Sequence, residues 1–307
     1  MEKIAADILK NSLNLKKNQK VLIITDNKCE KIGEALFKAA KKVSKEVILT
    51  KIPVSHIPGT EPPKKIASFM QKFDVVLAPT WGSLTHTKAV QIARKKGVTI
   101  ATLPGITGKI MKQSMTANFK KVEKITQKLY SKIKNAKKLK ITTPSGTNII
   151  LQPRRWILDT GIIKKSEVGN LPGGELFCAP KEKITDGIIV VDSFRNNSEV
   201  FAPKGTSIVV VDGEAIITTK NCKLTKLFRT IKNSTNIAEF GIGTNYKAKV
   251  IGNILQDEKV LGTCHIAFGN NTSMGGKVYS KMHLDCILFK PTIYADKKII
   301  MKKGKII

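Results

Sequence analysis

Short apolar segments alternate with helical patterns through the first 140 residues, and this alternation constrains the fold more than any other feature of the chain. It predicts parallel strands joined by crossover helices. Uninterrupted apolar residues such as Val75, Val76 and Leu77 indicate strands buried on both faces. The expected strands are 21–26, 46–52, 74–79 and 98–104, and the expected helices end at Ser12 or span about 29–44, 62–72, 86–96 and 116–140.

Beyond residue 140 the pattern changes to strands separated by tight turns. Apolar segments flank Pro144-Ser145-Gly146 and Asp212-Gly213-Glu214, and the last 23 residues read as a hairpin. One helix is expected at about 222–233. The predicted fold is therefore α/β, with a parallel-sheet domain at 1–140 followed by a β-rich α+β domain at 141–307.

The chain is strongly basic, with 54 Lys and Arg against 23 Asp and Glu and a net charge of +31. Such a charge is compatible with nucleic-acid binding, so a non-catalytic nucleic-acid-binding protein is one hypothesis. Aromatic residues make up only 6% of the chain and Lys far outnumbers Arg, both of which disfavour base recognition. Because the lysines recur at helical spacing, a solvated lysine-rich surface is the preferred interpretation and nucleic acid is not the expected partner.

Cysteine usage and the N-terminus bear on location. The five cysteines are odd in number and widely spaced, which predicts neither a disulfide framework nor a Cys-x-x-Cys site. Residues 1–13 form an amphipathic pattern that contains acids, unlike a signal peptide, and no apolar segment approaches the ~20 residues that span a bilayer. We expect a soluble, cytoplasmic protein that does not bind membranes.

Several common catalytic motifs are missing from the sequence. The first strand-to-helix turn lacks Gly-x-Gly-x-x-Gly, and the segment 105–110 has the wrong glycine spacing for a phosphate loop. Neither His-Glu-x-x-His nor Gly-x-Ser-x-Gly occurs. Dinucleotide, nucleoside-triphosphate, zincin and α/β-hydrolase chemistry are disfavoured.

Two of the four histidines lie near acids in the second domain. His283 and Asp285 are two residues apart in an expected strand, so both side chains face the same side and could hold one cation. His265 lies in another apolar strand. A His-x-Asp pair alone is more often a histidine satisfied by its neighbour within a sheet.

Two further acids strengthen the metal hypothesis. Glu175 follows a rigid Pro-Gly-Gly turn, and Glu239 lies within an apolar strand. A buried carboxylate is costly without a cation, hydrogen bonds or a proton. Glu258 precedes His265 by seven residues and could reach the same place, although an exposed acid in a turn explains it equally well.

A polar segment after the third expected strand is a candidate for substrate binding. Ser83, Thr85 and His86 lie where a parallel strand ends and a helix begins, the edge at which open α/β sheets bind ligands. Ser83 and His86 are predicted to contact substrate. As the alternative, Ser83 or Thr85 simply caps the helix.

An ordered series of segments carries a resemblance to a known family. GNLPGGELF, AEFGIGTN, DEKVLGTCHIAFGNN, a GG pair and HLD follow one another in the second domain, and EPPKKIASFM, DVVLAPTWGSLTHTKA and TIATLPGIT lie in the first. These segments resemble the metallo-aminopeptidases of the aminopeptidase T and aminopeptidase S group, especially its shorter archaeal and bacterial members often called leucyl aminopeptidases. The resemblance covers most of the chain.

The resemblance implies a homodimeric, metal-dependent aminopeptidase that removes N-terminal residues from small peptides or amides. It implies two divalent cations, zinc or cobalt and less commonly manganese, with one bridging carboxylate. The metal ligands that it implies are Glu175, Glu239, His265, His283 and Asp285, and it makes Glu258 the acid that ligates or accepts a proton.

One departure from the family keeps a second enzyme class open. Longer members have a tyrosine seven residues after the position of His265, where this chain has Thr272. The same superfamily includes an iron-dependent dioxygenase that cleaves the ring of 2,5-dihydroxypyridine. His265, His283 and Asp285 supply the two histidines and one carboxylate that a single non-haem Fe(II) requires.

Overall fold

The computed structural model describes residues 1–56 and 59–307, which form two compact units. The first comprises Met1–Glu123 and Asp159–Gly173, and the second Lys124–Leu158 and Gly174–Ile307. The chain therefore passes between the units three times, whereas the sequence predicts a single division at residue 140. The return of 159–173 to the first unit has no counterpart in the hydrophobic pattern.

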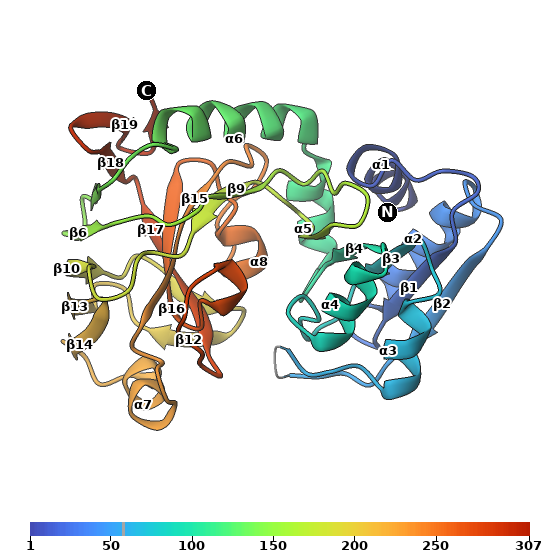
Figure 1. The fold of residues 1–307 in the computed structure, drawn as a ribbon, viewed down its shortest axis with the longest axis horizontal. Helices are drawn as coiled ribbons and strands as arrows, with labels where there is room; N and C mark the ends of the chain where they lie inside the picture. The colour runs from blue at the N-terminus through green and yellow to red at the C-terminus, as the bar shows by residue number, and fades with distance from the viewer. Residues whose placement is uncertain (57–58) are drawn as a thin grey trace. The chain divides into compact units, whose positions relative to one another are not determined.

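The first unit contains the predicted parallel sheet, with strand order β2-β1-β3-β4-β8 (Figure 1). Its strands are β1 (Val21–Thr25), β2 (Val47–Lys51), β3 (Val75–Ala78), β4 (Thr99–Thr102) and β8 (Val168–Asn170). All four pairings are parallel. Every residue of β1, β3 and β4 is buried, as expected for strands covered on both faces.

Each predicted helical segment of this region contains a helix, and the short helix at Gly108–Lys112 has no counterpart in the prediction. The helices are α1 (Glu2–Asp7) with a π-helical turn (Ile8–Ser12), α2 (Glu30–Lys41), α3 (Lys64–Met70), α4 (Lys88–Lys95), α5 (Gly108–Lys112), a 3-10 turn (Ser114–Thr116) and α6 (Phe119–Ile133), which spans the division at 123/124. The N-cap of α4 is Thr87, whose side chain accepts from the Val90 amide, so neither Ser83 nor Thr85 caps this helix. Among the described residues, no helix has the length and apolar character needed to span a membrane.

The second unit is built from antiparallel strands, as the turn signals predict. Its largest sheet has the order β14-β13-β10-β6-β5-β18-β19-β20, and a second has the order β17-β16-β15-β9-β7 (Figure 1). The first set is β5 (Leu139–Thr142), β6 (Asn148–Leu151), β10 (Asp186–Val190), β13 (Ser207–Val211), β14 (Glu214–Thr218), β18 (Thr292–Ala295), β19 (Lys298–Lys302) and β20 (Lys305–Ile306). The second set is β7 (Ile157–Asp159), β9 (Glu175–Cys178), β15 (Ile237–Gly243), β16 (Thr263–Gly269) and β17 (His283–Phe289).

Smaller elements complete this unit. β11 (Phe194–Asn196) and β12 (Glu199–Ala202) pair with each other as a separate hairpin. The helix α7 (Lys223–Thr230) lies in the predicted helical segment. The short helix α8 (Ile254–Asp257) precedes β16, and a 3-10 turn (Thr272–Met274) follows β16. The core joins both large sheets to α6 through residues that are at most 8% exposed. It includes Ile133 of α6, Ile189 of β10 and Phe240 of β15.

Loss of Phe240 from the core should destabilise the second unit. Phe240 is fully buried, and its ring packs edge to face against Trp156 at a centroid distance of 6.3 Å. We expect Phe240→Ala to lower the free energy of unfolding by about 3–5 kcal/mol, because the cavity adds to the lost burial. Urea unfolding measures this change. Tyr279→Ala is the matched control, because Tyr279 is 65% exposed. An equal loss of unfolding free energy in both variants would contradict the assignment of Phe240 to the core.

Candidate metal centre

Four neighbouring strands of the second unit present the predicted ligands on one face of their sheet. Ala267 of β16 is paired with Glu239 of β15 on one side and with Asp285 of β17 on the other. His265 lies two residues from Ala267 on β16, and His283 lies two residues from Asp285 on β17. Both histidines are therefore on the same face of the sheet as Glu239 and Asp285. Alternation along each strand thus gathers side chains that are far apart in sequence.

Small residues occupy the positions between these side chains. Gly241 lies opposite His265, and Gly269 lies opposite His283. A Cβ atom on Gly241 would lie 2.2 Å from Nε2 of His265, so only glycine lets the imidazole cross this strand. The other face of the sheet bears large apolar side chains that belong to the core, namely Phe240, Ile242, Ile266, Phe268 and Leu288.

Glu175 joins the cluster from β9, where it pairs with Gly243 of β15. A β-bulge between Ile237 and Glu239 allows Ile237 to remain buried while Glu239 points to the polar face. Because β9 begins at Glu175, the rigid turn before this residue leads directly into the sheet, as the sequence suggests.

The side-chain distances divide the cluster into two overlapping groups. Nε2 of His265 lies 3.1 Å from Oε1 of Glu239 and 3.6 Å from Oε2 of Glu175. Nε2 of His283 lies 3.2 Å from Oε2 of Glu239 and 3.6 Å from Oδ1 of Asp285. Each group offers three donor atoms that lie within 4.8 Å of one another, and Glu239 belongs to both.

These donors fit a divalent metal ion. Oε2 of Glu175 is buried and makes no hydrogen bond within the described residues, so it is available to a cation. Nδ1 of His283 is 2.8 Å from the carbonyl oxygen of Asn270, an arrangement that fixes the ring and leaves Nε2 to a metal. Mixed imidazole and carboxylate donors suit zinc, cobalt, manganese or iron.

A fully buried lysine, Lys259, enters the cluster and has no counterpart in the sequence prediction. Its Nζ lies 2.5 Å from Oε1 of Glu175 and 2.9 Å from Oε1 of Glu258. Glu258 lies at the C-terminal end of α8, in the turn before β16, and only 14% of its side chain is exposed. In a chain this rich in lysine, one more lysine carries no signal, and only the fold shows its burial.

The neighbouring carboxylates raise the pKa values of both histidines. Burial lowers the pKa of His265, but the hydrogen bond to Glu239 and the charge of Glu175 outweigh burial and raise it to about 9. Burial also lowers the pKa of His283, and the charge of Asp285 and hydrogen bonds to Asp285 and Glu239 raise it well above its usual value. The same carboxylates would attract a metal cation.

Burial raises the pKa of each acid, but the net shifts have opposite directions. Burial raises the pKa of Glu239, but its hydrogen bonds to His265 and His283 prevail and lower it well below the usual range. Burial raises the pKa of Glu175 to about 8 and that of Glu258 to about 7, although Lys259 opposes both shifts. Glu175 and Glu258 therefore hold their protons more tightly than exposed glutamates do.

The predicted substrate-binding residues lie in the first unit. Ser83 Oγ is 3.0 Å from Thr85 Oγ1, which also lies 3.0 Å from Oδ1 of Asn170, at the C-terminal end of β8. His86 is exposed in the turn before α4. Contact of Ser83 and His86 with substrate stays a prediction.

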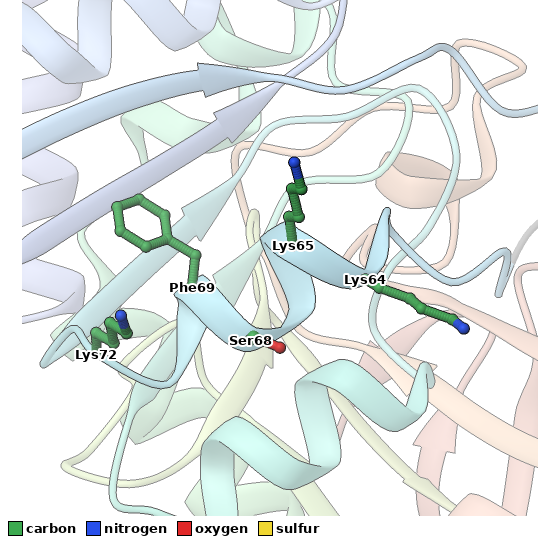
Figure 2. Close-up of a pocket in the computed structure, with 5 residues that line it drawn as sticks. All are labelled: Lys64, Lys65, Ser68, Phe69 and Lys72. Atoms are coloured by element: carbon green, nitrogen blue, oxygen red, sulfur yellow. The ribbon is translucent and has the colours of Figure 1, made fainter.

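Two surface hollows are lined by residues that do not belong to the ligand cluster. One, of about 440 Å³, is at the start of α7, and the other, of about 370 Å³, is lined by α3. Figure 2 shows the side chains of Lys64 and Lys65, in α3, and of Lys72, in the turn after it, pointing in different directions. These ammonium groups do not converge on a shared ligand, so the hollow is a solvated lysine surface.

Thr272 begins the 3-10 turn that follows β16. Its Oγ1 is 2.9 Å from Oδ1 of Asn270, the residue whose carbonyl contacts His283. Tyr279, seven residues further along the chain, is 65% exposed. The hydroxyl of Thr272 therefore contacts the segment that orients His283.

The fold and the clustered donors define a metal-binding protein with an α/β unit and a β-rich unit. Residues 106–285 match the family described as thermophilic metalloprotease (M29), and the chain belongs to this family. The resemblance found in the sequence is thereby confirmed at the level of the family. None of the curated proteins is similar enough to the chain to match it.

Two solved structures share the whole fold. The chain superposes on 2,5-dihydroxypyridine dioxygenase from Pseudomonas putida KT2440 with a TM-score of 0.83 and 17% identity, covering 100% of this chain and 96% of that chain. It superposes on wild-type AmpT from Thermus thermophilus with a TM-score of 0.70 and 16% identity, covering 100% of this chain and 98% of that chain. At these identities the likeness establishes the fold alone.

Proposed function

We propose that this chain is a metal-dependent aminopeptidase that removes N-terminal residues from small peptides or amides. The observation that supports this proposal is the pair of donor groups sharing Glu239, found in a member of a metalloprotease family. A shared carboxylate can hold two ions at the short separation of a co-catalytic pair. Zinc, cobalt and manganese are the proposed metals.

The proposed roles follow from the contacts of each side chain. Bound divalent ions would lower the pKa of a water molecule and polarise the scissile carbonyl. Glu239, Glu175, Asp285 and the Nε2 atoms of His265 and His283 would hold the ions. Glu258 would receive the proton of the attacking water, with Lys259 holding its Oε1 atom in place.

Hydrolysis of leucyl anilides tests this function directly. The metal-loaded protein should release leucine from a leucyl anilide and from short peptides, and acetylation of the free amine should lower kcat/KM at least about 100-fold, because the amine would lose its place beside the metal. EDTA should abolish the activity, and zinc or cobalt should restore it. The Asp285→Asn variant should be inactive. The control variant Asp212→Asn, which changes an acid in an exposed turn, should keep its activity. Equal cleavage of free and acetylated substrates would contradict an aminopeptidase.

A mononuclear Fe(II) dioxygenase of the 2,5-dihydroxypyridine type is the second candidate. It is favoured by the contact of Lys259 with Glu175, which places an ammonium beside one donor group and so favours a single ion over a pair. The proposed iron ligands are His265, His283 and Asp285, of which His265 belongs to the other donor group and would have to approach the remaining two. Oxygen consumption by the iron-loaded protein with 2,5-dihydroxypyridine separates the candidates. Oxygen uptake without anilide hydrolysis would favour the dioxygenase.

We further propose that the protein is a homodimer, which light scattering in solution can test.

Ser83 and His86 are proposed to contact the substrate. Nucleic acid is not a proposed partner, and metal-independent binding of a polyanion would instead support the non-catalytic hypothesis.

A further inference from the structure

The buried ammonium group of Lys259 is a cation that the chain itself supplies to the metal centre. Its side chain is fully buried, and it bonds to Glu175 and Glu258. Its backbone is fixed at both ends, because its amide donates to the carbonyl of Gln256 and its carbonyl accepts from the amide of Asn245. Lys259 is therefore held beside the carboxylates and cannot simply swing into solvent.

The two donor groups differ in their relation to this lysine. The group of Glu175, Glu239 and His265 includes a carboxylate that Lys259 already bonds through its other oxygen atom. The group of Glu239, His283 and Asp285 is made of side chains that bond to one another. A divalent ion in the first group would share the Glu175 carboxylate with the ammonium of Lys259. The ion and the ammonium are both positive, and two positive charges on one carboxylate repel each other strongly where bulk water is excluded.

We propose that Lys259 makes the two metal positions unequal. The position of Glu239, His283 and Asp285 holds one divalent ion tightly, and the position of Glu175, Glu239 and His265 binds a second ion at least about tenfold more weakly. Lys259 thus acts as a fixed substitute for part of the charge of the second ion. The inference rests on the metal dependence of the proposed function and concerns the number and affinity of the ions.

Titration with Co²⁺ of the full-length protein, stripped of metal with EDTA, tests this proposal. Calorimetry and the visible absorption of bound Co²⁺ count the ions and separate their affinities. The unchanged protein should bind one equivalent tightly, with a second step at least about tenfold weaker. Lys259→Met keeps the length of the side chain but removes its charge, and should tighten the second step at least about tenfold.

Two further variants complete the experiment. Lys204→Met removes an exposed lysine from the same unit and should leave both steps unchanged. Glu258→Gln combined with Lys259→Met removes one buried charge of each sign, so the test survives if Lys259→Met alone unfolds. Two equal steps in the unchanged protein, or a second step that Lys259→Met and the double variant both leave unaltered, would overturn the proposal.

Anilide hydrolysis, measured alongside, distinguishes this inference from the proposed function. Two equal Co²⁺ steps with active hydrolysis would overturn the inequality alone. Unequal steps without hydrolysis would leave the inequality standing and contradict the aminopeptidase. Absence of any Co²⁺ binding would overturn both.

Discussion

A Glu239→Gln variant should lose both metal positions at once. Glu239 is the one residue that belongs to both donor groups, and its two oxygens separately contact His265 and His283. The amide keeps the shape of the side chain but offers one neutral oxygen, so we expect the affinity for zinc or cobalt to fall more than about 100-fold. Metal analysis after dialysis measures the loss, and anilide hydrolysis should disappear with it.

The matched control is Glu199→Gln, which neutralises an acid of the same unit that pairs with Lys223 at the surface. This control should retain its metal. Glu239 points away from the core face of its sheet, so circular dichroism of both variants should match the unchanged protein. Full metal content in Glu239→Gln would exclude the cluster as the metal centre.

Gly241→Ala should disable the centre without altering any ligand. The new methyl group would lie 2.2 Å from Cε1 and Nε2 of His265, so the imidazole must turn away from Glu239. Because ligand position governs metal affinity, we expect binding to weaken about 10- to 100-fold. Titration with Co²⁺ measures the change, and a shift of the His265 ring resonances would show the movement directly.

Gly108→Ala is the corresponding control for this variant. A Cβ atom at Gly108 meets only a methionine methyl group at 3.8 Å, and the residue begins a helix of the first unit. Unchanged metal affinity in Gly241→Ala would show that His265 does not hold the ion. Gly241 is thus a positioning residue, and stability alone cannot report its role.

The alternation of strands and helices in the first unit could be predicted because parallel buried strands are uninterrupted apolar segments. β1 and β3 begin and end within one residue of the expected limits. No expected strand covers β8, because Val168–Asn170 is short, mixed in composition and far along the chain from its partner β4. Pairing over such a distance leaves no local pattern.

The candidate ligands were identifiable for a different reason. A carboxylate in an apolar strand, such as Glu239, is costly enough to indicate a function. What the sequence could not show is the register, which aligns Glu239, Ala267 and Asp285 in one row. Nor could it distinguish Lys259 from the many lysines at the surface, because burial of a charged side chain depends on its partners.

The return of Asp159–Gly173 to the first unit has a consequence for how this fold can be divided. Neither unit is a continuous stretch of chain, so exchanging one unit between relatives requires three junctions. A fragment ending at residue 140 would lack β8 and leave β4 as an unpaired edge, a surface that favours aggregation. The two units are separable in architecture but are specified by interleaved segments, and a recombinant chimera must respect all three crossings.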